Sequence, residues 1–312
     1  TIRNNSDAGI SADPNSFLED AFRAGPDVFG NVLDQNSING LLVRITTSFG
    51  SPVDRLTVPA RFVARDISYV LTESLTIAGG EGGLTQSGGV LRENAAGRLL
   101  IDPGAVVKLR NSRIELERGN SQLIAEGTAE KPIVFTSLAD QRFGSGAVGP
   151  FNTNGNLPDV PAAGNWGGII LNATSRGSLD NVYLAYAGGT TPIEGGVAPF
   201  NPIEVHQATF RLANSRIENN ASGNAPTNRN GRGSTSAATV FVRGAQPVIL
   251  KNDFRNNLGD AISINVNSLI EDKQGDTGRQ TGVIGRNERY ESNSGPLVRE
   301  NRFSNPISSS GS

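Results

Sequence analysis

Residues 97–109 read Gly97-Arg98-Leu99-Leu100-Ile101-Asp102-Pro103-Gly104-Ala105-Val106-Val107-Lys108-Leu109. Apolar residues alternate on both sides of a Pro-Gly turn, and alternation at period two marks strands with one buried face. Further short apolar runs follow at 114–116, 123–125 and 133–135, with four to seven residues between neighbouring runs. Many short strands joined by tight turns predict an all-β fold, either a sandwich, a barrel or a solenoid.

A short phrase that begins with asparagine recurs along the chain and favours the solenoid. Asn-Ser-Arg-Ile-Glu occurs at 111–115 and again at 214–218. In a coil, each turn (here called a rung) stacks on the last, so turn asparagines can hydrogen-bond along the stack, whereas a sandwich gives no reason for the recurrence. We therefore expect five asparagines to stack between rungs: Asn111, Asn181, Asn214, Asn252 and Asn301.

Five phrases in a fixed order resemble a known class of proteins. They are the phrase at 97–109 and those at 123–128, 131–137, 164–169 and 183–189, and together they cover roughly residues 65–270. The chain is similar to the right-handed parallel β-helix repeat regions of large secreted or surface-displayed bacterial proteins. The resemblance implies an all-β, right-handed parallel β-helix solenoid with loop insertions, and an extracellular or cell-surface location. The matching residues build rungs, so the resemblance implies little about activity.

A longer period relates the two ends of the chain. When the sequence is shifted by 252 residues, nine of the twenty residues from 1 to 20 are identical to their counterparts in 253–272. After a three-residue adjustment, 40–44 aligns with 295–299. Two rungs of one solenoid can also look alike through shared Asn and Ile, but Glu19-Asp20 and Glu271-Asp272 agree outside the rung core.

We infer one super-repeat of about 250 residues followed by the opening of the next. The expected organisation has three parts: 1–40 as the end of one super-repeat and a bridging segment, 41–270 as the parallel β-helix, and 271–312 as a loop insert and the start of the next bridge.

Composition excludes several functions. The chain of 312 residues has no Cys, a net charge of −2 and only 19% charged residues. Disulfides, thiolate metal sites and a cysteine nucleophile are excluded, and no basic face is available for nucleic acid. The longest apolar runs are too short to span a membrane, so we expect no membrane insertion. No glycine-rich phosphate loop stands where a strand enters a helix.

The resemblance makes an enzyme worth testing. Lyases of this fold use Ca²⁺ and an Arg or Lys base, and its hydrolases use clustered Asp residues, but the Asp-Asp pairs of the glycosidases are missing here. Glu204 and His206 are expected to face outward on one strand, either as a proton-transfer pair or as a solvated face. Trp166 is expected to cap a rung bend or to stack on a sugar. A catalytic cleft would require several of these groups to meet: Asp180, Glu204, His206, Asp253 and Asp260.

Four inserts interrupt the rungs, at 143–164, 188–199, 219–236 and 271–296. Loops on a rigid scaffold often bind ligands, although solenoid turns also accept insertions without any function. In the last insert, Asp272 and Asp276 are candidate Ca²⁺ ligands, because oxygen ligands at short intervals around Gly suit a hard cation. A plain charged loop is the other interpretation, and no other cofactor is expected.

Taken together, these patterns predict a non-catalytic structural segment of an extracellular fibre, stalk or adhesin that associates end to end. Its expected partners are other copies of the chain, flanking repeats and surface glycans. The alternative is a polysaccharide-binding or polysaccharide-cleaving β-helix domain of the lyase or glycosidase type.

Overall fold

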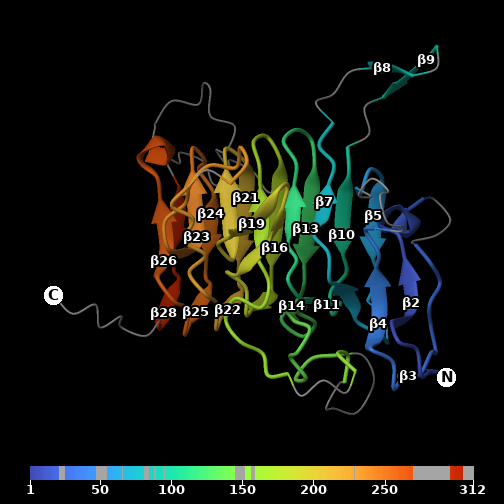
Figure 1. Ribbon diagram of the computed structural model, residues 1–312. Helices are drawn as coiled ribbons and strands as arrows, with labels where there is room; N and C mark the ends of the chain where they lie inside the picture. The colour runs from blue at the N-terminus through green and yellow to red at the C-terminus, as the bar shows by residue number, and fades with distance from the viewer. Residues whose placement is uncertain are drawn as a thin grey trace.

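In the described part of the chain, nearly all of the regular secondary structure is β-strand, and the strands stack side by side (Figure 1). In addition, two short 3-10 helices are present, η1 (Pro14–Phe17) and η2 (Val266–Leu269). The computed structural model describes residues 1–20, 25–46, 55–64, 66–80, 84–87, 89–93, 96–144, 152–155, 159–227, 229–269 and 296–304.

Three long sheets account for most of the strands, and the strand pairs within them are parallel. The nine-stranded sheet has the order β2 (Ala8–Ala12), β4 (Ile38–Val43), β6 (Tyr69–Leu71), β11 (Val106–Leu109), β14 (Ile133–Ser137), β17 (Val182–Ala185), β22 (Arg216–Glu218), β25 (Asp253–Arg255) and β28 (Arg302–Ser304). The seven-stranded sheet has the order β27 (Leu297–Arg299), β24 (Val248–Leu250), β21 (Thr209–Ala213), β16 (Arg176–Asp180), β13 (Gln122–Glu126), β10 (Arg98–Ile101) and β5 (Pro59–Phe62). The six-stranded sheet has the order β26 (Asp260–Ile264), β23 (Ala238–Arg243), β20 (Ile203–His206), β15 (Ile169–Leu171), β12 (Ile114–Leu116) and β7 (Leu75–Ile77).

Three small two-stranded sheets complete the described structure. β1 (Ile2–Arg3) pairs in parallel with β3 (Leu33–Asp34), while the other two sheets are antiparallel hairpins. The hairpins project from the stack, as Figure 1 shows for the first of them: β8 (Leu84–Ser87) with β9 (Val90–Glu93), and β18 (Thr190–Ile193) with β19 (Gly196–Pro199).

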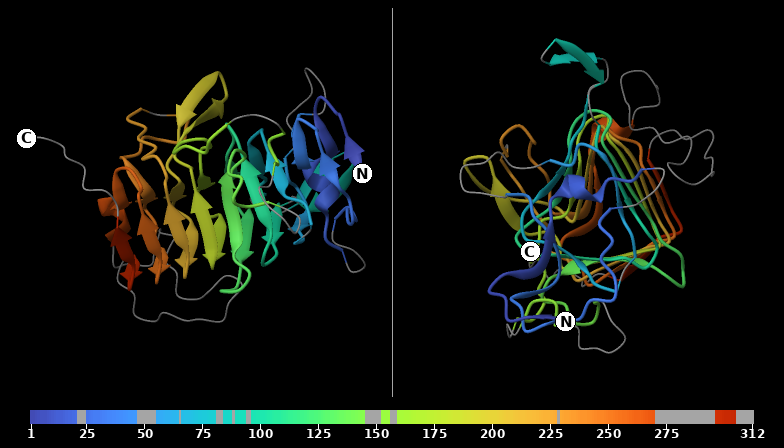
Figure 2. Two further views of the ribbon diagram at one scale, coloured as in Figure 1. Left: turned by 90° about the horizontal axis from the view of Figure 1, so that it is seen from below. Right: turned by 90° about the vertical axis from the view of Figure 1, so that its right-hand side faces the viewer.

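The chain visits the three long sheets in a fixed rotation. From β10 onward it passes from the seven-stranded to the nine-stranded and then to the six-stranded sheet before returning to the first. Each strand therefore pairs with the strand one rung away, and the three sheets run as walls along the stack (Figure 2). This arrangement confirms the predicted all-β fold of stacked parallel strands and is consistent with a parallel β solenoid.

One apolar core runs along the stack. Alternate residues of most strands in the three long sheets enter it, for example Leu99 and Ile101 in β10. In the six-stranded sheet, Ile114, Ile169 and Ile203 occupy equivalent positions on successive rungs and are all fully buried. Burying each such side chain stabilises the fold by about 1.5–3 kcal/mol, so the repeating apolar positions hold neighbouring rungs together.

Asparagine side chains connect the rungs at one bend. Oδ1 of Asn252 accepts the backbone N–H of Ser215 at 3.0 Å, and its Nδ2 donates to the carbonyl of Leu212 at 2.9 Å. Asn301 repeats both contacts one rung later, with the N–H of Asn252 at 3.0 Å and the carbonyl of Ile249 at 2.8 Å. A buried N–H without a partner is costly, so this ladder satisfies backbone groups that the bend leaves outside the sheets.

Of the other three asparagines predicted to stack, Asn181 and Asn214 lie one position earlier in this bend, whereas Asn111 lies in the bend between β11 and β12. Asn111, Asn181 and Asn214 have φ of 51°, 48° and 50°, the left-handed conformation that Asn tolerates better than most residues. Val182 and Ser215, which follow Asn181 and Asn214, take the position that Asn252 and Asn301 occupy. Asparagine therefore has two structural roles in this bend, as the left-handed turn residue and as the residue that hydrogen-bonds to the neighbouring rung. The recurring sequence motif does not distinguish them.

The two roles predict different losses in the free energy of unfolding when the asparagine is replaced. Asn252→Ala leaves a buried N–H and a buried carbonyl without partners, and should lower the free energy of unfolding by about 1–3 kcal/mol. Asn111→Gly keeps a residue suited to positive φ at an exposed position and should change stability by less than about 0.5 kcal/mol. Urea unfolding followed by circular dichroism measures both, and equal costs would contradict the assignment.

The 252-residue offset is also visible in local structure. β2, which spans 8–12, corresponds to β26, which spans 260–264, and η1 corresponds in the same way to η2. Asn4 and Asn256, at equivalent places, have φ of 61° and 51°. The sheets do not correspond, because β2 belongs to the nine-stranded sheet and β26 to the six-stranded one.

Candidate functional site

The outer face of the six-stranded sheet carries two buried carboxylates. Glu115 on β12 and Glu204 on β20 lie two rungs apart in one register, with Ile170 of β15 between them. All three side chains point away from the core, as alternation requires. The hairpin β18–β19 and the insert at 219–236 contribute residues that contact this face, so its polar groups are removed from water.

Glu204 and His206 are a buried pair rather than a solvated strand face. Glu204 is fully buried and His206 nearly so. Nε2 of His206 lies 2.9 Å from Oε2 of Glu204, and Arg229 donates to both carboxylate oxygens at 2.7 and 2.9 Å. Burial alone would raise the pKa of Glu204, but the hydrogen bonds from His206 and Arg229 outweigh it and hold that pKa below its ordinary value. Sequence alternation placed both residues on the outer face but could not show that Arg229 covers them.

Glu115 is held by two arginines in the same way. Arg113 donates to Oε2 at 2.9 and 2.7 Å, and Arg232 donates to Oε1 at 2.7 Å and to Oε2 at 3.1 Å. Burial opposes ionisation of Glu115, but Arg232 and Arg113 together lower its pKa. Arg232 also donates to Glu194 on the connection between β18 and β19, and this lowers the pKa of that carboxyl to about 2.

An aromatic ring links the two carboxylate clusters. Phe200 follows β19 and is fully buried. The guanidinium carbons of Arg113 and Arg229 lie 4.6 and 4.8 Å from its ring centroid, so both cations contact the same ring. The clusters around Glu115 and Glu204 are thus parts of one network that fastens the two inserts to the sheet.

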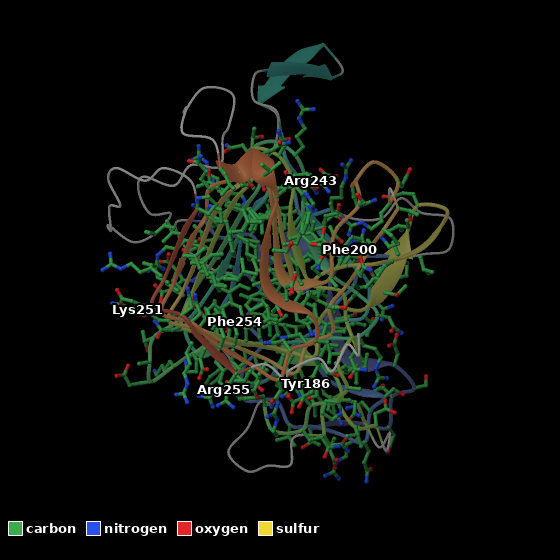
Figure 3. The ribbon with its side chains drawn as sticks, turned by 90° about the vertical axis from the view of Figure 1, so that its left-hand side faces the viewer. Tyr186, Phe200, Arg243, Lys251, Phe254 and Arg255 are labelled. Carbon is green, nitrogen blue, oxygen red and sulfur yellow. The ribbon has the colours of Figure 1, made fainter. Side chains whose placement is uncertain are left out.

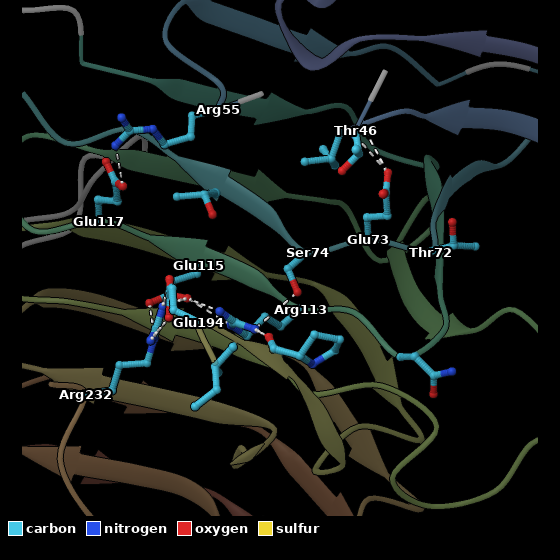
Figure 4. A pocket seen from close by; sticks show the side chains of 15 residues that line it. Thr46, Arg55, Thr72, Glu73, Ser74, Arg113, Glu115, Glu117, Glu194 and Arg232 are labelled. Atoms are coloured by element: carbon cyan, nitrogen blue, oxygen red, sulfur yellow. Dashed lines mark hydrogen bonds and ion pairs between the residues drawn. The ribbon is translucent and has the colours of Figure 1, made fainter. Parts of the chain in front are cut away.

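A groove of about 580 Å³ lies beside the Glu115 cluster (Figure 4). Hydroxyls of Thr72, Ser74 and Thr76 line it along one side. Across it, Arg55 donates to Glu117 at 2.8 Å. The remaining lining residues of the groove are Ile45, Thr46, Glu73, Asn111, Arg113, Glu115, Pro192, Ile193, Glu194 and Arg232.

The other candidate acids do not join this site. Asp180 lies in the seven-stranded sheet, where it forms a buried ion pair with Arg211. Asp253 lies in the nine-stranded sheet beside Arg255, and Asp260 is exposed at the start of β26. Of the five candidate catalytic groups, the structure brings together only Glu204 and His206.

Trp166 is part of the core. It is fully buried, and its indole Nε1–H donates to the carbonyl of Ala185 at 2.8 Å. A fully buried ring has no face to offer a sugar.

The candidate calcium ligands Asp272 and Asp276 fall outside the described residues. Within the residues that the structure does describe, no three His, Asp or Glu side chains are grouped so that they could hold a metal ion. The same part of the chain contains no helix long and apolar enough to cross a membrane.

Lys108 forms a second polar site, on the outer face of the nine-stranded sheet, that sequence reasoning missed. Its side chain is fully buried, and Nζ donates to the carbonyl of Asp140 and to Oγ1 of Thr153, each at 2.9 Å. Burial lowers the pKa of Lys108 to about 8. The available signal was its outward position between Val107 and Leu109, but nothing local indicated that residues 152–155 cover it.

This lysine should make stability increase with pH. Between pH 8 and 10.5, the folded chain binds fewer protons at Lys108 than the unfolded chain does. The free energy of unfolding should therefore rise by about 3 kcal/mol across this range relative to Lys108→Met, which has no group to titrate there. Urea unfolding of both chains at a series of pH values measures the difference, and parallel curves would contradict the assignment.

Comparison of the chain with protein-family models, curated proteins and solved structures gives no match, so the function is argued from the geometry alone.

Proposed function

We propose that this chain is a non-catalytic structural segment of an extracellular fibre, stalk or adhesin, wound as a right-handed parallel β-helix. The observation that carries the proposal is that arginines bind both oxygens of the two buried carboxylates on the six-stranded sheet. Glu115 and Glu204, which are both buried, each have both oxygens engaged by arginine. A general acid or nucleophile needs an oxygen within reach of a substrate, whereas these carboxylates hold inserts against a sheet.

The asparagine ladders support the idea of a continuing stack. At a second bend, the N–H and Nδ2 of Asn220 donate to Oδ1 of Asn257 at 3.2 and 2.8 Å. Asn5 donates in the same two ways to Asn36, at 3.1 and 2.7 Å, near the other end of the protein. A unit whose beginning repeats the local geometry of its end can follow itself in one chain without a new core, because each rung is stabilised by its neighbours.

A fused chain tests this proposal. Residues 1–252 followed directly by residues 1–312 should fold as one rod, with a maximum dimension roughly twice that of the single chain and one unfolding transition. Small-angle X-ray scattering and urea unfolding measure both properties. The control joins 1–246 to 1–312, which shifts the register by six residues and should give two hinged units. If the first fusion behaves like this control, the proposal fails.

A second candidate, polysaccharide binding, is favoured by the groove beside Glu115. Its hydroxyls, guanidinium groups and carboxylates are the partners that sugar hydroxyls use. Calorimetric titration with neutral and acidic oligosaccharides tests it. Arg55→Ala, in the groove, should weaken binding about tenfold, the effect of losing roughly one charge-assisted hydrogen bond, while Arg176→Ala on another sheet should not. An absence of binding by the unmodified chain would rule this candidate out.

A further inference from the structure

A second pocket, of about 550 Å³, lies beside the turns that follow two neighbouring strands of the nine-stranded sheet. Gln141 and Arg142 line it after β14, and Tyr186 lines it directly after β17. Val160 and Pro161, near the end of the insert at 143–164, add apolar side chains to the lining. A volume of this size is typical of sites for small ligands, which combine apolar surface with a few polar groups.

Tyr186 keeps a strained backbone in this pocket. Its φ is 63°, in the left-handed region that bulky residues avoid. The residues at the same bend on the next two rungs are Asn219 and Asn256, with φ of 57° and 51°, and asparagine adopts this conformation more readily. In the view along the coil, Tyr186 lies at a corner of the cross-section, whereas Phe254 lies inside the core (Figure 3). Strained residues cluster at sites that bind ligands, so the strain points to a function for this ring.

Arg142 holds the half-buried Tyr186 ring in place. Its Nη2 donates to the hydroxyl oxygen of Tyr186 at 3.1 Å, and its guanidinium carbon lies 5.5 Å from the ring centroid. The guanidinium is itself fixed by the fully buried Asp140, to which Nε and Nη2 donate at 2.9 and 3.0 Å. Nη2 also donates to the hydroxyl oxygen of Tyr183 at 2.7 Å. The aromatic surface is therefore ordered before a ligand binds, which lowers the entropic cost of binding.

The lining groups match a neutral sugar. The C–H face of a pyranose ring is apolar and packs on an aromatic ring, while its hydroxyls both donate and accept hydrogen bonds. Tyr186 and Pro161 supply apolar surface, and the exposed amide of Gln141 has both donors and an acceptor. The charged lining residues are Asp140, Arg142 and Asp159. With two carboxylates and one guanidinium, the pocket has no excess of positive charge to attract an acidic ligand.

We propose that this pocket binds a neutral pyranose unit of a glycan. The C–H face of the sugar packs on the ring of Tyr186, and its hydroxyls bond to Gln141, Arg142 and Asp159. The inference goes beyond the proposed structural function, because it gives the segment a glycan site on its side. This site is separate from the groove beside Glu115, which lies on the six-stranded sheet.

The experiment is saturation-transfer NMR and calorimetric titration of the full chain with neutral oligosaccharides of glucose, galactose, mannose and N-acetylglucosamine. Oligogalacturonate serves as the acidic comparison. We expect at least one neutral oligosaccharide to bind, with saturation transferred mainly to the C–H protons of one face of the sugar. Oligogalacturonate should bind at least about tenfold more weakly, because the pocket offers its carboxylates no excess of positive charge.

Tyr186→Asn is the decisive variant, because asparagine occupies this bend on the next two rungs and suits the left-handed backbone. It should keep the circular dichroism spectrum of the unmodified chain but bind the neutral oligosaccharide at least about tenfold more weakly. Tyr186→Phe keeps the ring and should bind within about threefold of the unmodified chain. Gln141→Ala, which changes only an exposed side chain, should weaken binding about fivefold through lost hydrogen bonds. Arg55→Ala, in the other groove, should bind like the unmodified chain.

Three results overturn the inference: no neutral oligosaccharide binds, oligogalacturonate binds more tightly, or Tyr186→Asn or Gln141→Ala binds as tightly as the unmodified chain. Binding that is weakened by Arg55→Ala and not by Tyr186→Asn would place the sugar in the groove beside Glu115, and it would overturn the inference as well. The fused chain described above does not depend on sugar binding. A continuous fused rod without a sugar site would therefore remove this inference and leave the proposed function standing.

Discussion

Glu204→Ala should lower the free energy of unfolding by about 3–5 kcal/mol, because it leaves the charge of Arg229 buried without its carboxylate. The side chain of Arg229 is 2% exposed and donates to both oxygens of Glu204. Hydrogen bonds to backbone carbonyls remain, but they do not neutralise a cation in a site closed to water. Urea unfolding at neutral pH measures the loss.

Two further variants separate the contribution of the buried ion pair to stability from the contribution of side-chain packing. Glu204→Leu combined with Arg229→Met replaces the pair with apolar groups of similar size and should recover most of the stability. Glu194→Ala removes an exposed partner of Arg232 and should cost less than about 1 kcal/mol. If Glu204→Ala costs no more than Glu194→Ala, the ion pair between Glu204 and Arg229 does not stabilise the fold.

The stability that Glu204 contributes depends on pH with a defined sign. The pKa of Glu204 is lower in the folded chain than in the unfolded chain, so its contribution to stability is complete above its unfolded pKa. The contribution is lost as the pH falls toward the lower folded value, because the unfolded chain takes up the proton first.

Trp166→Ala should have an effect of similar size, about 3–5 kcal/mol, through the cavity that loss of a large buried side chain leaves. The indole lies fully inside the apolar core and also donates to Ala185. Trp166→Phe keeps an aromatic ring and should cost less, since it loses the hydrogen bond and part of the buried area.

Fluorescence gives an independent readout, because Trp166 is the only tryptophan in the chain. Its emission should be that of a buried indole in the folded protein and should shift to longer wavelength on unfolding, in step with circular dichroism. An emission already typical of a solvated indole before denaturant is added would contradict its place in the core.

The repeating strands and their core positions could be predicted from the sequence. The contacts that the inserts make with the outer faces of the sheets could not. Alternation at 97–109 predicted the strands and the core side of each, because every rung meets nearly the same surroundings. The burial of Glu204 and Lys108 could not be predicted, because Arg229 and Thr153 come from inserts whose path depends on contacts made only in the folded chain.

The asparagine phrase shows a second limit. Short polar side chains suit both a left-handed turn residue and a hydrogen-bonding ladder, and the two positions are adjacent here. At the rungs of Asn252 and Asn301, the left-handed position is taken by Lys251 and Glu300 instead. Only the backbone angles separate the two roles.

The pairing of each strand with strands one rung away has a consequence for how the protein opens. Because an interior rung is supported on two sides and a terminal rung on one, amide hydrogen exchange should be slowest in the middle of the stack. Protection from exchange should then fall in steps toward both ends, so that the terminal rungs open before the rungs in the middle of the stack.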